Sequence, residues 1–117
     1  MKRIENRTNY LFVEFDDAYQ LEVILGLMRE VAEVCRQQKF SKVLVDLSNM
    51  PGKISIMDRF QMGVAGANTF RGVAQVALIY RKDEINRFAE TVGVNRGANV
   101  AVFGDAESAK KWLGIEQ

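Results

Sequence analysis

The chain has 117 residues, of which 48% are hydrophobic and 26% charged, and its formal net charge is +1. This length suits one domain with a buried core, and the near-neutral charge gives no global attraction for nucleic acid or a membrane surface. There is no histidine and only one cysteine, Cys35, which excludes Cys/His zinc sites, histidine-dependent nucleophiles and internal disulfides. A lone cysteine also favours the cytoplasm. No apolar run approaches the roughly 20 residues that a membrane span needs.

The first third of the chain predicts two strands and a long helix. Residues 3–7 are a weak strand candidate, and residues 10–15 predict a central strand that can pair with it as a hairpin. Asp17 is expected to cap the helix, whose main apolar face is formed by Leu21, Ile24, Leu25, Met28, Val31, Ala32 and Cys35. Val23, Leu27 and Val34 widen that face, which predicts either broader contact with the sheet or a homodimer interface.

The rest of the chain alternates strand and helix patterns. Residues 43–47, 73–80 and 99–103 predict buried strands, each followed by an expected helix N-cap, namely Ser55, Asp83 and Asp105. Ser55 and Asp58 have capping-box spacing. In the helix that they open, the expected core residues are Phe60, Val64 and Ala67, and the glycines favour close packing against a neighbour. Gly114 is expected to end the last helix.

The predicted order is therefore β-β-α-β-α-β-α-β-α. Strands that alternate with helices favour an α/β fold with a mostly parallel sheet and right-handed crossovers. We expect about five strands and four helices in a single domain over residues 1–117, with the short first strand as the antiparallel member.

A family resemblance rests on the stretch around Asp46-Leu47-Ser48, which closes a predicted strand, and Asp58, which opens the next helix. In these features the chain resembles STAS-like domains, specifically their SpoIIAA-like branch. STAS domains of sigma-factor regulation carry Asp-Ser-Ser-Gly-Leu-Gly at that helix start, whereas residues 58–63 here read Asp-Arg-Phe-Gln-Met-Gly. Asp58 and Gly63 match, but Arg59 and Phe60 stand where the family has its phosphoacceptor Ser or Thr. Residues 88–92, 95–97, 100–103 and 109–113 resemble the closing elements of the branch.

The resemblance implies a bacterial, non-enzymatic regulatory module that binds a protein partner. Because neither Arg59 nor Phe60 can accept phosphate from a serine kinase, it further implies binding without a phospho-switch. The branch is also similar in architecture to SEC14-type lipid-binding domains, so a carrier of a small amphipathic or anionic, lipid-like ligand is the alternative. Its apolar pocket would be lined by Met50, Met57, Phe60, Met62 and Phe70. An enzyme is the weakest of the three hypotheses, and no cofactor or metal is expected.

The candidate binding site lies where ligands of parallel sheets usually bind, beyond the carboxyl ends of the strands. The residues expected there are Ser48, Asn49, Lys53, Ser55, Asp58, Arg59, Phe60, Arg81 and Lys82. Four of these nine are cations, and two predicted helix starts face the same edge, which favours a small anionic ligand or an acidic partner. The alternative is that they are ordinary solvated loop charges.

Overall fold

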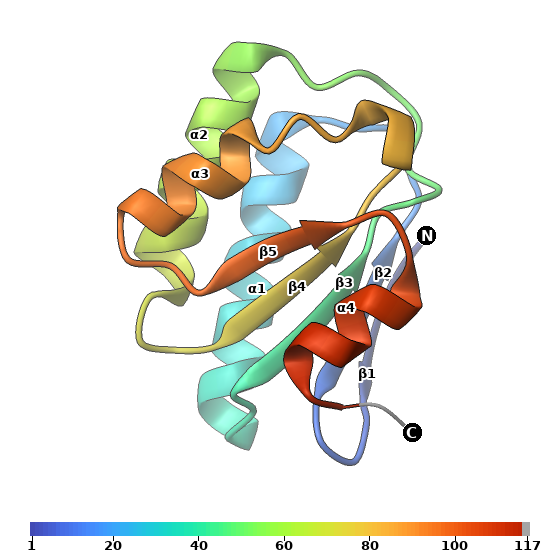
Figure 1. Ribbon diagram of the computed structural model, residues 1–117. Helices are drawn as coiled ribbons and strands as arrows, with labels where there is room; N and C mark the ends of the chain where they lie inside the picture. The colour runs from blue at the N-terminus through green and yellow to red at the C-terminus, as the bar shows by residue number, and fades with distance from the viewer. Residues whose placement is uncertain (116–117) are drawn as a thin grey trace.

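The computed structural model describes residues 1–115 and contains one five-stranded sheet in the order β1-β2-β3-β4-β5 (Figure 1). An antiparallel hairpin joins β1 (Lys2–Asn6) to β2 (Leu11–Phe15). The remaining strands, β3 (Lys42–Asp46), β4 (Gln75–Ile79) and β5 (Val100–Phe103), all run parallel to β2. The prediction of a mostly parallel α/β sheet with one antiparallel strand is therefore confirmed.

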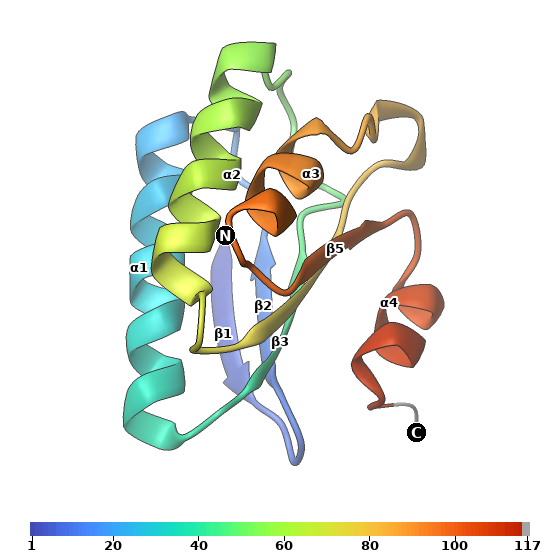
Figure 2. The ribbon, with the colours of Figure 1, turned by 60° about the vertical axis from the view of Figure 1, so that its left-hand side comes forward.

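In the described part of the chain, four α-helices and one short 3-10 helix connect or follow the strands. They are α1 (Leu21–Gln38), α2 (Ile56–Phe70), η1 (Lys82–Glu84), α3 (Phe88–Asn95) and α4 (Ala106–Leu113). Figure 2 shows α1, α2 and α3 on one face of the sheet and α4 on the other. Each parallel crossover steps to the next strand in the same direction, so right-handed connections place all three crossover helices on one face. Helix α4, the last element within residues 1–115, lies on the opposite face.

The core has two layers because alternate strand residues point to opposite faces of the sheet. On the crossover-helix face, Val13, Val43 and Val76 pack with residues of α1 and α2. On the other face, Leu44 and Ile79 belong to a second cluster with residues of α4. Residues buried in α1 are Ile24, Leu27, Val31, Ala32 and Cys35. Of the three residues that widen the apolar face, Leu27 thus belongs to the core, whereas Val34 is half-buried and Val23 is exposed.

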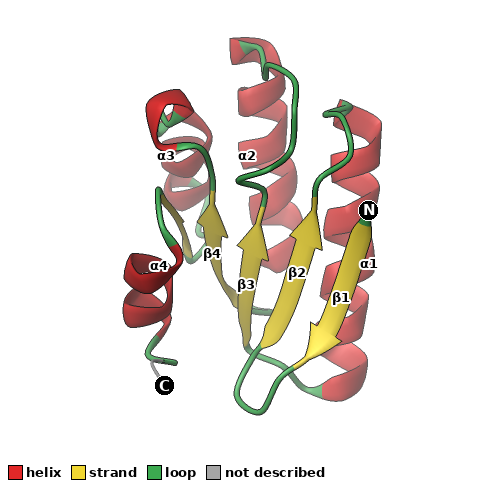
Figure 3. Ribbon diagram, turned by 90° about the vertical axis from the view of Figure 1, so that its right-hand side faces the viewer, coloured by secondary structure: helices red, strands yellow, loops and turns green. Residues whose placement is uncertain are grey.

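Helix α4 leaves the β1 and β2 part of its face uncovered (Figure 3). Phe12 lies on this part of the sheet, beneath the guanidinium groups of Arg3 and Arg7, whose Cζ atoms are 5.6 and 4.8 Å from its ring centroid. Glu5 pairs with both arginines, and Glu14 pairs with Arg3. Phe12 also packs against the cluster that contains the α4 residues, so charged side chains cover the outer side of a ring at the margin of that cluster.

Two of the predicted helix caps are confirmed. The Ser55 hydroxyl accepts a hydrogen bond from the Asp58 N–H at 3.1 Å, and the Asp105 carboxylate accepts from the Ser108 N–H at 2.7 Å. Gly114 ends α4 in the left-handed conformation, with φ of 74°, as its position predicts.

The other two predicted caps are wrong. Helix α1 starts only at Leu21, and Asp17 instead binds the amino group of Met1. Asp83 lies within the 3-10 helix η1, and α3 begins at Phe88, whose N–H donates to the Asn86 side chain at 3.0 Å. A capping side chain must stand directly before the first helical turn, and neither Asp17 nor Asp83 does, since the residues before α1 and α3 are Gln20 and Arg87.

Asp105 is expected to make stability depend on pH. The backbone N–H and the hydroxyl of Ser108 hold the pKa of the Asp105 carboxyl below its ordinary value. Because this pKa is lower in the folded state, the ionised Asp105 carboxylate stabilises the folded protein. This stabilisation is complete above the unfolded-state pKa, about 4, and is lost as the pH falls through the lower folded-state pKa. Asp105→Asn keeps the capping oxygen but does not titrate. In urea unfolding, the stability advantage of the wild type over Asp105→Asn should shrink on acidification, and a pH-independent difference would contradict this assignment.

Candidate functional site

The loop between β3 and α2 lies at the carboxyl ends of the parallel strands, and buried side chains anchor it to the core. Leu47 and Met50 are buried, while Asn49 and Lys53 are exposed. Ser48 donates to the Asp46 carboxylate twice, from its N–H at 2.9 Å and from its hydroxyl at 2.6 Å. The predicted site residue Ser48 is thus held in a local turn at the end of its strand.

Arg81, two residues after the end of β4, binds this loop. Its guanidinium donates to the carbonyl oxygens of Met50 and Gly52, the latter at 3.0 Å, and to the Tyr80 hydroxyl at 3.0 Å. The carbonyl groups of an irregular loop lack partners in a sheet or helix and must find them elsewhere. The planar fork of arginine can satisfy two such oxygens at once. Arg81 therefore holds the loop against the end of the sheet.

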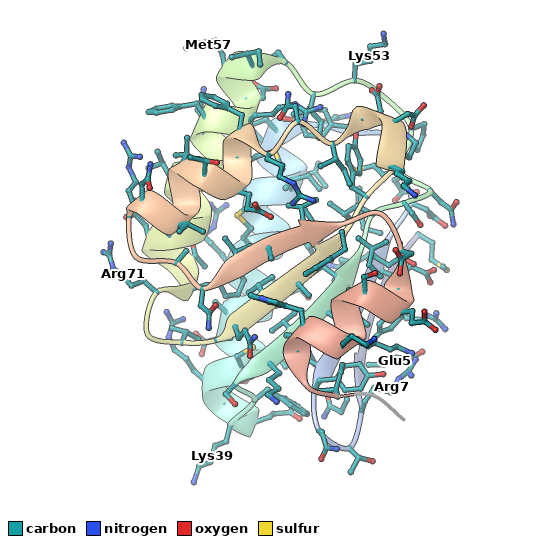
Figure 4. All side chains as sticks on the ribbon, in the orientation of Figure 1. Glu5, Arg7, Lys39, Lys53, Met57 and Arg71 are labelled. Atoms are coloured by element: carbon teal, nitrogen blue, oxygen red, sulfur yellow. The ribbon has the colours of Figure 1, made fainter. Side chains whose placement is uncertain are left out.

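Arg59 has a similar role at the start of α2. Its Nε donates to the carbonyl of Ile54 at 3.2 Å, and its Nη2 donates to the carbonyl of Glu84 at 3.2 Å. A third contact joins Nη1 to the Asn86 side chain at 3.3 Å. Both arginines of the predicted cation cluster thus bind the protein's own backbone. Lys53 and Lys82 are exposed, and Figure 4 shows Lys53 directed away from the fold.

Asp58 connects α2 to the segment between β2 and α1. Its carboxylate accepts a hydrogen bond from the Tyr19 hydroxyl at 2.8 Å, and the Tyr19 N–H donates to the carbonyl of Pro51 at 2.8 Å. Burial, with the hydrogen bond to Asp58, raises the pKa of Tyr19 well above its ordinary value. Tyr19 was missed at the sequence level because a single tyrosine in a loop carries no spacing signal. It fixes the same β3–α2 loop as Arg81.

An exposed apolar surface lies on the first turns of α2. We call Ile56, Met57 and Phe60 the α2 patch; their exposed fractions are 58%, 68% and 39%. The expectation that Phe60 faces the core is wrong: it lies on the side of α2 that holds the buried Gly63 and Ala67, but one turn nearer the N-terminus, where the side chains are exposed. The guanidinium of Arg96 instead stacks on Phe60, with Cζ 5.4 Å from the ring centroid. Figure 4 shows Met57 at the outer end of α2, on the same side of the molecule as Lys53.

An apolar cavity of about 110 Å³ lies between the sheet and helices α1, α2 and α3. Met62 and Phe70 line it, as the carrier hypothesis expected, whereas Met50, Met57 and Phe60 do not. Gly66 also lines it, and a methyl group built on this residue would meet no atom within 4 Å. A smaller cavity of about 40 Å³ shares Met62 with the first and reaches the polar side chains of Arg59, Asn86 and Arg87.

Within residues 1–115, no three His, Cys, Asp or Glu side chains gather closely enough to hold a metal ion. In the same range, no helix combines the length and hydropathy needed to cross a membrane.

The sheet order and the placement of helices on both faces agree with the STAS-like fold that the sequence resemblance implies, and comparison with solved structures supports this fold. The crystal structure of an anti-sigma factor antagonist from Mycobacterium paratuberculosis superposes with a TM-score of 0.63, covering 97% of this chain and 93% of that one. Sequence identity is 9%, so the likeness shows the fold alone. No protein-family model and no curated protein matches the chain in sequence.

Proposed function

We propose that the protein is a non-enzymatic regulatory module of STAS type that binds a protein partner through the α2 patch. The observation that carries the proposal is the exposure of Ile56, Met57 and Phe60 on consecutive turns of one helix. Clustered exposed apolar side chains mark interaction sites, and methionine adapts to the shape of a partner. The similar solved structure is that of an anti-sigma factor antagonist, a protein named for its action on another protein. The free, buried Cys35 suits a cytoplasmic setting.

We further propose that binding is constitutive. Regulatory STAS domains are switched by phosphate on a hydroxyl at the helix start, and the corresponding positions here are Arg59 and Phe60. Arg59 is bound to the carbonyls of Ile54 and Glu84, and Ser55 caps the helix, so the local residues already have structural roles. Incubation with ATP and cell lysate, followed by mass spectrometry, should find no stoichiometric phosphate on residues 55–60. Stoichiometric phosphate there would overturn the constitutive form of the proposal.

Partner binding is tested with Met57→Glu in the α2 patch and Val94→Glu as a matched control. Val94 is also an exposed apolar helical residue, 49% exposed, but it lies in α3 and outside the patch. A charge at the centre of a docking surface costs more than one elsewhere on the surface. A partner captured by the wild type from lysate of the source cells should be lost with Met57→Glu and retained with Val94→Glu. Equal capture by both variants would contradict the role of the patch.

The cavity beneath α2 supports a second candidate, a carrier of a small ligand with an apolar portion. An engineered apolar cavity of about 150 Å³ binds benzene in another protein. A volume of about 110 Å³ therefore suits a small ring or a short hydrocarbon segment rather than a whole lipid. Native mass spectrometry of freshly purified protein should show a bound mass that leaves on denaturation. Gly66→Leu, which fills the cavity, should abolish it, whereas Gly66→Ala should not. Protein free of bound mass would remove this candidate.

A further inference from the structure

The outer edge of β1 has backbone groups that point away from the sheet. Among the described residues, 1–115, β1 has a strand neighbour on one side only, β2, and Figure 3 shows it at the sheet's edge. The ladder includes Arg7 N–H to the Tyr10 carbonyl at 2.9 Å and, at the other end, Asp16 N–H to the Met1 carbonyl at 3.1 Å. Antiparallel ladders alternate bonded and non-bonded pairs. Odd-numbered residues of β1 therefore bond to β2, and the N–H and C=O groups of Lys2, Ile4 and Asn6 face outward.

We propose that β1 pairs with β1 of a second copy of this chain, antiparallel about a two-fold axis at Ile4. In this register Ile4 lies opposite the partner's Ile4, and Lys2 lies opposite the partner's Asn6. These are the residues whose backbone groups point outward, so every one of them gains a partner. Arg3 lies opposite the partner's Glu5, and the two-fold axis repeats this ion pair. The strand sequence is thus complementary to itself in charge and in hydrogen bonding.

Other two-fold registers fit less well. An axis at Arg3 or at Glu5 would set like charges directly opposite each other, Arg3 against the partner's Arg3 or Glu5 against the partner's Glu5. An axis at Lys2 or Asn6 would leave most of the strand unpaired. Charged side chains on an edge strand normally discourage pairing. Here Arg3 and Glu5 lie on either side of Ile4 with opposite sign, so in the Ile4 register they attract instead.

One flank of α1 supports the same interface. Glu30 accepts a hydrogen bond from Lys2 at 2.7 Å, and Gln38 accepts one from Asn6, which places this flank beside β1. Val23, 42% exposed, and the half-buried Val34 share the flank with Glu30 because residues seven and four apart lie on one side of a helix. A two-fold axis perpendicular to the sheet brings both α1 flanks to the same face of a continuous sheet. The apolar residues of the flank then gain partial cover.

Sedimentation velocity from micromolar to millimolar concentration tests the proposal, with any tag placed at the C-terminus. The wild type should form a concentration-dependent dimer. Arg3→Glu and Glu5→Arg each place two like-charge pairs across the axis and should weaken the dimer about tenfold or more. In an equimolar mixture of the two variants the new glutamate of one chain faces the new arginine of the other, so a heterodimer should form.

Several outcomes would overturn the interface. They are a wild type that stays monomeric at millimolar concentration, single variants that dimerise as the wild type does, and a mixture of folded variants that remains monomeric. Circular dichroism checks the fold of each variant, because Arg3 also pairs with Glu14 within the chain. If either charge variant is unfolded, Ile4→Pro and Ile4→Ala replace the pair. Both substitutions remove the isoleucine side chain, but only proline also removes the outward N–H. The dimer affinity of Ile4→Pro should therefore be well below that of Ile4→Ala.

Discussion

Gly63→Ala is expected to lower the free energy of unfolding by about 2 kcal/mol. A methyl group on Gly63 would lie 2.7 Å from the carbonyl oxygen of Ala89 and 2.7 Å from Cβ of Val92. Both belong to α3, and because one contact is with backbone, a simple side-chain rotation cannot relieve it. The two helices must move apart. Alanine favours the helix by about 1 kcal/mol over glycine, but this gain does not offset the loss of packing between α2 and α3.

Gly66→Ala is the matched control, since it makes the same change in the same helix one turn later. The new methyl group meets no atom within 4 Å, so only the gain in helix propensity remains. This variant should be as stable as the wild type or more stable by up to about 1 kcal/mol. Urea unfolding followed by circular dichroism measures both effects. Equal changes in the two variants, or a Gly63→Ala protein of wild-type stability, would refute the close contact between α2 and α3.

The local patterns of the sequence predict most of the fold. Alternation of strand and helix signals, with the rule for crossover handedness, leads to the parallel sheet, and Gly63 indicates a close helix contact before the neighbour is known. Phe60 shows where the approach fails. Helical spacing correctly groups Phe60 with Ala67, which is buried, but Phe60 lies near the N-terminal end of α2, which extends beyond α1 and α3 (Figure 2), and it is 39% exposed. How far a helix extends beyond its neighbours is not contained in its periodicity.

The candidate site could be predicted in its location but not in its contacts. The rule for parallel sheets places Arg59, Arg81 and Lys53 near the same sheet edge. Nothing in the sequence distinguishes the roles of these three cations. In the structure the two arginines bind backbone carbonyls, because the β3–α2 loop has acceptors that no strand or helix satisfies. Lys53 extends from that loop. The difference depends on the three-dimensional path of the loop, which no local pattern contains.

Arg81→Met is expected to lower the free energy of unfolding by about 2 kcal/mol, since it leaves the carbonyl of buried Met50 without its charged donor. Amide hydrogen exchange should also become faster in residues 48–55, because Arg81 binds two carbonyls of that loop. Arg81→Lys keeps the charge, but the lysine ammonium can bind only one of the two carbonyl oxygens in good geometry. This variant should therefore recover part of the lost stability. Stability of Arg81→Met within about 0.5 kcal/mol of wild type would contradict this role.

Lys53→Met is the control that separates a structural clamp from an anion site. Lys53 lies in the same loop and carries the same charge, but it is exposed, so its loss should change stability by less than about 0.5 kcal/mol. If the cations served an anion, inorganic phosphate would stabilise the wild type and would do so less in both Lys53→Met and Arg81→Met. If Arg81 only clamps the loop, Arg81→Met alone loses stability, and phosphate does not change the stability of either variant. The second result is expected, and it would leave the α2 patch as the proposed binding surface at this end of the sheet.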